Sequence, residues 1–275
     1  MEAHLDSSVA LPRAVIPTAT VGRVGQLGRV GFVGTFLAAW LVLDRLVAAP
    51  PAAPNAAIAL LASTTVLVVG ERVTAGTPLR DIAARLGLGR PRGRAVVAAA
   101  LVGAAVVATY VGGAALAGID LELRSNWPSV LLGALLFHGV AEEMVWRGYV
   151  YGAFRRTATF RRAVVRSMPL IALTHVPIIA GNGLGVGGLA VLSAIVTCLP
   201  LAHLYDRGGR TIWAPAIVHG LIGTWQLFER TFPVEFSLLI LVGSILTPLA
   251  ALALGDRSPR RAPAATTASP ERTGA

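Results

Sequence analysis

Long apolar runs alternate with short polar segments along most of the chain. A helix needs about 20 mostly apolar residues to cross the roughly 30 Å hydrocarbon core of a bilayer. About eight runs reach or approach that length, near 29–49, 56–71, 95–118, 128–154, 167–181, 184–205, 211–229 and 234–254. The pattern predicts an all-α, polytopic transmembrane bundle of about eight spans. The fifth run is short and meets the glycine-rich stretch 181–188, which is compatible with a tilted, broken or partly re-entrant segment there.

The polar segments outside these runs predict the domain boundaries. Residues 1–27 and 256–275 are expected to be disordered cytoplasmic tails around one helical domain, 28–255. The first tail has no apolar h-region, so no cleavable signal peptide is expected. Segment 72–94 places Leu79, Ile82, Leu86 and Leu88 among arginines, which indicates a short amphipathic helix on the cytoplasmic membrane surface.

Composition and charge agree with an integral membrane protein. Hydrophobic residues make up 55% of the 275 positions and charged residues 14%, too few charges to cover a soluble domain. All 24 basic residues are arginines, and they concentrate in short loops such as 72–94 and 155–166. The positive-inside rule places those loops and both termini in the cytoplasm. We therefore expect the bilayer, and no nucleic acid, as a partner, and an arginine-only, alanine-rich chain indicates a bacterial cell membrane.

The fourth run carries four ionisable residues where a membrane span should be apolar. In "HGVAEEMVWR", His138 lies four residues before Glu142, and Glu143 lies four residues before Arg147. Residues four apart share one face of an α-helix, so each pair can interact, whereas the two glutamates point about 100° apart. Ionisable groups inside a membrane are costly and usually functional.

Two further apolar runs each contain a histidine, His175 and His219. By the rise of an α-helix, both lie at about the depth of Glu142 below the cytoplasmic boundary. Taken singly, an intramembrane histidine or a Glu–Arg pair often only joins helices. Together, the set favours a functional site that opens toward the cytosol.

Three chemistries fit a set of glutamate and two histidines. A carboxylate aided by histidine can deprotonate water for attack on a peptide carbonyl, while the second histidine stabilises the oxyanion. Alternatively, Glu142, His175 and His219 can bind zinc and leave one position open for water. As a third chemistry, the set can relay protons in a transporter.

The motifs resemble those of the CPBP family of intramembrane proteases, which includes type II CAAX prenyl proteases and Abi immunity proteins. "EEMVWR" matches the family's EExxxR motif, and "IALTH" resembles FxxxH with Ile171 in place of phenylalanine. "HGLIG", from His219 to Gly223, resembles a third motif in which asparagine or a hydrophobic residue follows histidine by four. Order and spacing agree over the core 128–229.

The resemblance implies a role for each of these residues. Glu142 and His175 would activate the hydrolytic water, and Glu143 would support the site. Arg147 would hold the glutamates, and His219 would help to stabilise the oxyanion. Gly223 has no side chain to donate, and Gly223→Asn is expected to preserve or raise activity if the third motif works as in the family.

The sequence thus predicts an endopeptidase that cleaves a membrane-associated protein or peptide near the cytoplasmic leaflet. A mechanism without a metal is favoured over zinc. The alternative is a noncatalytic membrane binding, immunity or scaffold protein that uses the same polar cavity.

Overall fold

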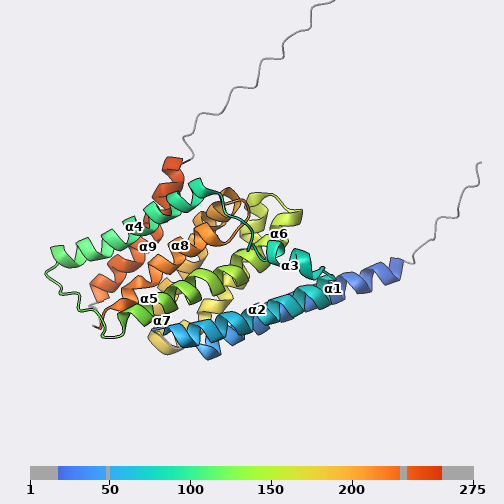
Figure 1. Ribbon diagram of the computed structural model, residues 1–275, viewed down its shortest axis with the longest axis horizontal. Coiled ribbons are helices and arrows are strands. Elements are labelled where there is room, and N and C mark those ends of the chain that lie inside the picture. Colours follow the sequence, from blue (N-terminus) through green and yellow to red (C-terminus); the bar gives the residue numbers. More distant parts are fainter. Residues whose placement is uncertain (1–17, 48–49, 230–233, 256–275) are drawn as a thin grey trace, which may run out of the picture.

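The computed structural model describes residues 18–47, 50–229 and 234–255, and there every named element is a helix (Figure 1). An isolated β-bridge joins Leu123 and Phe228. The elements are α1 (Thr18–Leu46), α2 (Ala53–Ala75), α3 (Leu79–Arg85), α4 (Gly93–Leu116), α5 (Trp127–Ala134), η1 (Leu135–Ala141), η2 (Met144–Tyr151), α6 (Gly152–Thr157), α7 (Phe160–Arg207), α8 (Trp213–Ile222), η3 (Gly223–Leu227) and α9 (Val234–Gly255).

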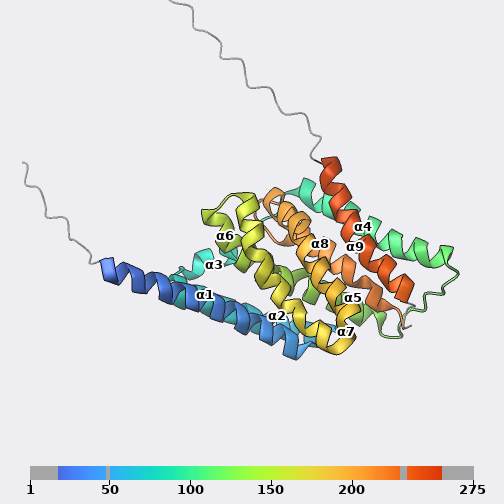
Figure 2. The ribbon, with the colours of Figure 1, turned by 180° about the vertical axis from the view of Figure 1, so that it is seen from behind.

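The helices form a bundle with the predicted site helices in its middle. α1 and α2 lie side by side along one side of the bundle, and α4 and α9 lie on the opposite side (Figures 1 and 2). Between them run α7, α8 and the continuous rod made of α5, η1, η2 and α6. The largest apolar core is centred on that rod, where Met144, Val145 and Ile171 are almost fully buried.

The structure confirms an all-helical protein with candidate membrane spans. Within the described residues, four helices are long and apolar enough to cross a bilayer: Ala53–Ala75, Gly93–Leu116, Trp127–Thr157 and Phe160–Arg207. A shorter apolar helix covers Leu238–Ala250. The number of eight crossings stays a prediction. Most of the two predicted tails, 1–17 and 256–275, lies outside the described residues, and α1 already begins at Thr18.

The 48-residue helix α7 is two arms that meet at Gly183. Gly183 has φ 76° and ψ 170°, a backbone conformation that favours glycine. A Cβ on Gly187 would lie only 2.6 Å from the backbone nitrogen of Ile179, so the second arm turns back onto the first. The glycine-rich stretch therefore breaks the helix as the sequence predicts, and the arms are 160–182 and 184–207.

One end of the bundle gathers the arginine-rich loops. Trp213 Nε1 donates to the Gly89 carbonyl at 2.8 Å, and Arg155 Nε donates to Asp206 Oδ2 at 2.8 Å. The Arg92 N–H also donates to the Gly208 carbonyl at 3.2 Å. These contacts join three segments that are far apart in sequence: 72–94, 155–166 and 206–213. The buried Glu71 strengthens this end, because its carboxylate accepts from Arg85 Nε at 2.7 Å and from the Thr77 hydroxyl at 2.8 Å.

The opposite end gathers loops that hold few arginines. The Arg124 N–H donates to the Leu227 carbonyl at 2.8 Å, next to the bridge between Leu123 and Phe228. The Ala53 N–H donates to Ser129 Oγ at 3.2 Å. The segments before α2, before α5 and after η3 therefore share one end of the bundle.

The predicted amphipathic segment forms the short helix α3. Ile82 and Leu86 are 3% and 1% exposed, so they pack into the core of the protein rather than face a membrane surface. Leu79 on the same segment is 69% exposed. The carbonyl of Leu86 lies directly against Gly148, which leaves no room there for a side chain.

Candidate active site

A close crossing of η1 and α8 brings two histidines together. A Cβ on Gly139 would lie 2.9 Å from the Ala216 carbonyl oxygen, and a Cβ on Gly220 would lie 3.6 Å from the Cα of Gly139. Small residues allow this approach. Each glycine directly follows a histidine, so the crossing places the rings of His138 and His219 with their centroids 5.7 Å apart.

The rod that carries both glutamates is wider than an α-helix on either side of them. The Glu142 N–H donates to the Phe137 carbonyl, and the Gly152 N–H donates to the Arg147 carbonyl, five residues back in each case. Such π-type turns are rare and are often found at functional sites. Despite the wider turns, the two predicted pairs four residues apart are both in contact.

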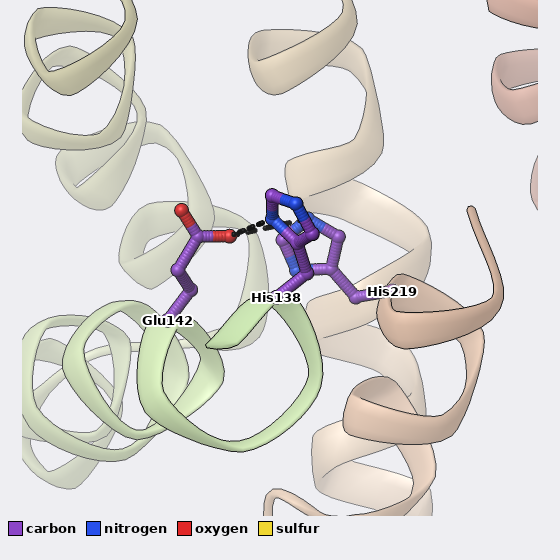
Figure 3. A group of neighbouring side chains, drawn as sticks. All are labelled: His138, Glu142 and His219. Atoms are coloured by element: carbon purple, nitrogen blue, oxygen red, sulfur yellow. Dashed lines mark hydrogen bonds and ion pairs between the residues drawn. The ribbon is translucent and has the colours of Figure 1, made fainter. Parts of the chain in front are cut away.

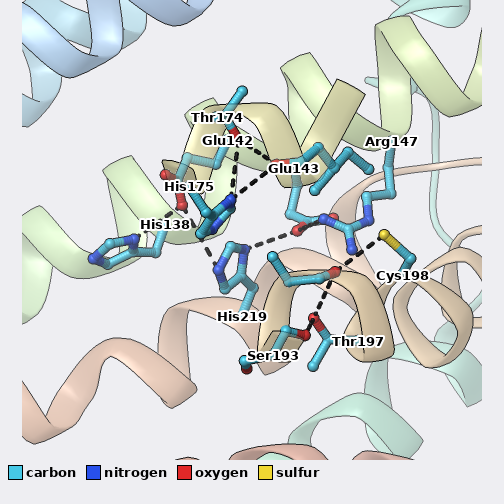
Figure 4. Close-up of polar contacts among 12 residues, drawn as sticks. His138, Glu142, Glu143, Arg147, Thr174, His175, Ser193, Thr197, Cys198 and His219 are labelled. Carbon is cyan, nitrogen blue, oxygen red and sulfur yellow. Dashed lines mark hydrogen bonds and ion pairs between the residues drawn. The ribbon is translucent and has the colours of Figure 1, made fainter. Parts of the chain in front are cut away.

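Glu143 occupies the inner part of the site and is fully buried. Its Oε1 accepts from Arg147 Nη1 at 2.8 Å and from His219 Nδ1 at 2.8 Å (Figure 4). Arg147 is 2% exposed, so the pair is a salt bridge inside the bundle. Because a carboxylate only accepts hydrogen bonds, His219 carries a proton on Nδ1.

Glu142 occupies the outer part of the site and keeps 13% of its side chain exposed. Its Oε2 lies 2.9 Å from His138 Nδ1 and 3.6 Å from His219 Nε2 (Figure 3). The latter distance is too long for a direct hydrogen bond. Glu142 is therefore the carboxylate that a molecule entering the site can reach.

Gln226 in η3 is a site residue that the sequence analysis missed. Its side-chain Nε2 lies 2.9 Å from His138 Nε2, and its backbone carbonyl accepts from Arg124 Nε at 2.9 Å. An amide nitrogen only donates, so His138 Nε2 accepts and His138 Nδ1 carries the proton that is donated to Glu142. A lone amide in an otherwise apolar run was the signal available in the sequence.

Trp146 is the second site residue that the sequence analysis missed. Its indole ring packs against the rings of two of the histidines. Its ring lies 5.2 Å from that of His175 and 5.5 Å from that of His219, centroid to centroid. Trp146 follows Glu142 by four residues, so its position on the same face was readable from the spacing. The three predicted runs thus meet at one tryptophan.

His175 reaches this cluster from the first arm of α7. Its Nδ1 lies 2.9 Å from the Ile171 carbonyl and 3.0 Å from the Thr174 hydroxyl (Figure 4). A carbonyl only accepts, so the Nδ1 of His175 is the protonated nitrogen and its Nε2 is an acceptor when the ring is neutral.

The ligand atoms that lie close enough for a metal ion differ from the predicted set. Among the described residues, one group qualifies, with its ligand atoms all within 4.8 Å: His138, Glu142 and His219. The set expected from the sequence contained His175 in place of His138. His138 takes part because η1 and α8 cross closely at Gly139 and Gly220, which brings its ring next to that of His219.

Comparison with known proteins identifies the region around this site. Residues 124–225 match the family model described as type II CAAX prenyl endopeptidase Rce1-like. Over these residues, the chain is similar to the CAAX protease family. A search of curated proteins gave no match.

The match to the CAAX protease family confirms the predicted resemblance and the prediction that the chain is a protease. The matched residues run from before α5 into η3 and contain every candidate residue taken from the sequence. Gln226 lies one position beyond the match.

Gly223 is where the chain departs from the asparagine form of the third motif, and the structure shows what lies there. A Cβ at this position would be 2.7 Å from the Cδ2 atom of His138. The imidazole of His138 therefore fills the space that a side chain at position 223 would need. The expectation that asparagine is tolerated there is revised.

We predict that Gly223→Asn destabilises the protein, because the new side chain must displace His138 from Glu142. Overpacking of this kind costs about 1–3 kcal/mol. The measurement is the thermal unfolding midpoint of the purified protein in detergent. Gly181→Asn is the matched control, since a Cβ there meets nothing within 4 Å. Equal midpoints for the two variants would contradict the prediction.

Proposed function

We propose that the chain is an intramembrane endopeptidase in which Glu142 activates water to hydrolyse a peptide bond. The observation that carries this proposal is the 3.6 Å separation of Glu142 Oε2 and His219 Nε2. With Nδ1 of His219 donating to Glu143, both facing atoms are acceptors in the neutral site. Two acceptors at this distance need a shared donor, and a water molecule supplies it.

The proposed reaction uses this pair of acceptors to move one proton. Glu142 Oε2 takes a proton from water, and the oxygen attacks the carbonyl carbon of the substrate. His138 supports Glu142 by donating from Nδ1, a role that Gln226 supports by bonding the other ring nitrogen. When the C–N bond breaks, the proton passes from Glu142 to the leaving amine.

Of the two remaining histidines, one helps to position the attacking water and the other stabilises the oxyanion. His175 presents Nε2 as an acceptor that helps to hold the attacking water. The proton taken from water can move from Glu142 to Nε2 of His219, which then donates a hydrogen bond to the oxyanion, and it returns to Glu142 before the C–N bond breaks. Glu143 and Arg147 keep the His219 ring in place. Glu143 is thus a positioning residue and does not touch the substrate.

The proposed substrate is a membrane-associated protein or peptide cleaved near the cytoplasmic leaflet. The partial exposure of Glu142, against the complete burial of Glu143, supports access to the outer carboxylate alone. The matching family model is described as a type II CAAX prenyl endopeptidase. For this chain, the proposal extends to membrane-associated peptides in general.

We predict that Glu142→Ala, His175→Ala and His219→Ala each reduce processing at least 100-fold, because general acid–base groups contribute about 10²–10⁴ in rate. The measurement is quantitative proteomics of membranes from a deletion strain complemented with each variant. The same uncleaved precursor should accumulate in the deletion strain and with all three variants.

The control for this experiment is Glu122→Ala, which removes an exposed glutamate far from the site in sequence. It should process the precursor normally. Normal processing by all three site variants would end the protease proposal. A phenotype that is lost on deletion yet kept by Glu142→Ala would instead support the noncatalytic binding protein.

A metal-dependent version of the same reaction has partial support. The ligand atoms of His138, Glu142 and His219 lie close enough together, and a bound zinc ion would supply a Lewis acid and activate water. Gln226, however, donates to Nε2 of His138, so that Nδ1 is protonated and has no lone pair for a metal. The donor set therefore favours the metal-free mechanism.

We predict that the purified full-length protein binds far less than one zinc ion per chain, and that 1,10-phenanthroline leaves processing in isolated membranes unchanged. Elemental analysis by mass spectrometry gives the zinc content. One zinc ion per chain that is lost in His138→Ala, together with inhibition by the chelator, would show that the metal-dependent version is right.

We further propose eight crossings with both termini in the cytoplasm of a bacterial cell. The clustering of the arginine-rich loops at one end of the bundle supports this arrangement, as does the reversal of α7 at Gly183. The short α3 segment would then lie on the cytoplasmic side, beside the arginine-rich end.

We predict opposite labelling of two exposed positions by a membrane-impermeant maleimide in a Cys198→Ser background. Ser125→Cys, at the arginine-poor end, should react in intact cells. Arg161→Cys, in the first turn of α7 at the arginine-rich end, should react only after the membrane is opened. The reverse pattern would overturn the orientation.

A further inference from the structure

A second cavity lies away from the active site, between α4, the second arm of α7 and α9. It has a volume of about 730 Å³, within the usual range for a ligand site. Figures 1 and 2 both show α4 and α9 crossing on the side of the bundle that is opposite α1 and α2. None of the site residues described above lines this cavity.

The wall of the cavity divides into a charged part and an apolar part. Arg92, Arg94 and Arg207 line it at the end of the bundle that gathers the arginine-rich loops. Val102, Leu204 and Pro248 line it farther along the helices. The cavity therefore places positive charge at the membrane boundary and apolar surface toward the membrane interior.

The position of Arg92 is fixed by the neighbouring turn. Its backbone N–H donates to the Gly208 carbonyl at 3.2 Å, which joins the start of α4 to the end of α7. Its side chain passes over Gly209, where a Cβ would lie 3.6 Å from Arg92 Cγ and from Arg92 Nε. Gly209 has φ 88°, so this turn favours glycine and leaves the arginine stem room to lie flat.

We propose that this cavity binds an anionic phospholipid of the leaflet that faces the arginine-rich end. The phosphate would lie between the guanidinium groups of Arg92 and Arg94, since guanidinium groups bind phosphate by paired hydrogen bonds. The upper parts of the acyl chains would lie along Ala98, Val102 and Leu204. Basic pockets between membrane helices commonly bind lipid head groups. The function is a lipid contact that joins α4 to α9, separate from peptide hydrolysis.

Native mass spectrometry of the full-length protein in neutral detergent tests the proposal. The probes are palmitoyl-oleoyl phosphatidylglycerol, the matching phosphatidylcholine and inorganic phosphate. Phosphatidylglycerol should be retained in preference to phosphatidylcholine. Arg92→Gln with Arg94→Gln should weaken its binding about 25-fold, at about fivefold for each arginine near an anionic head group.

Two matched controls separate the cavity from general surface charge and from loss of folding. Arg161→Gln with Arg162→Gln removes the same charge from exposed positions outside the cavity and should leave binding unchanged. Ala98→Phe should fill the cavity and weaken binding, whereas Ala100→Phe, exposed on the same helix and outside the cavity, should not.

Three results would overturn the proposal. Equal retention of the two lipids would show that the head-group charge is not recognised. An equal loss of phosphatidylglycerol binding in the two double-arginine variants would show that general surface charge, and not the cavity, binds the lipid. Competition by inorganic phosphate as strong as that by the lipid would show a phosphate site without a role for the apolar wall.

Discussion

The burial of the Glu143 carboxylate is the constraint on which the site depends. An ionised carboxylate inside an apolar bundle is stable only when it is paired and hydrogen-bonded. Arg147 supplies the charge from the next turn, and His219 supplies a second donor from another helix. Both bonds go to Oε1, whereas Oε2 is buried without a hydrogen-bond partner among the described residues. Through Oε1, Glu143 holds the His219 ring. Glu142, which lacks such an arginine, keeps an oxygen that faces His219 across a gap.

The hydrogen bond from His219 to Glu143 also requires η1 and α8 to lie close together. His219 reaches Glu143 because α8 crosses η1 at Gly139 and Gly220, where neither residue has a side chain of its own to hold the helices apart. Apolar packing alone gives little direction inside a membrane, so close contact and interhelical hydrogen bonds decide which helix faces are joined. The glycines therefore contribute to the chemistry indirectly, by fixing the distance between the carboxylate and the imidazole.

Contacts within one helix could be predicted from the sequence, and contacts between helices could not. The spacing of His138 to Glu142 and of Glu143 to Arg147 predicted both side-chain contacts, and the glycine stretch predicted the break at Gly183. The entry of His138 into the cluster with His219 depends on how η1 and α8 are rotated against each other. The π-type turns and the bond from Gln226 have the same origin, because they depend on long-range packing that no local pattern encodes.

Gly223, His138 and Gln226 form one arrangement. In the asparagine form of the third motif, an amide would stand at position 223, but here the His138 ring fills that space. An amide is instead supplied three residues later by Gln226, and it bonds the same imidazole. A side chain at 223 would require His138 to leave, and without His138 the Gln226 amide would lose its acceptor. The departure from the asparagine motif is therefore tied to the proton that His138 donates to Glu142, and it does not by itself indicate a weaker catalyst.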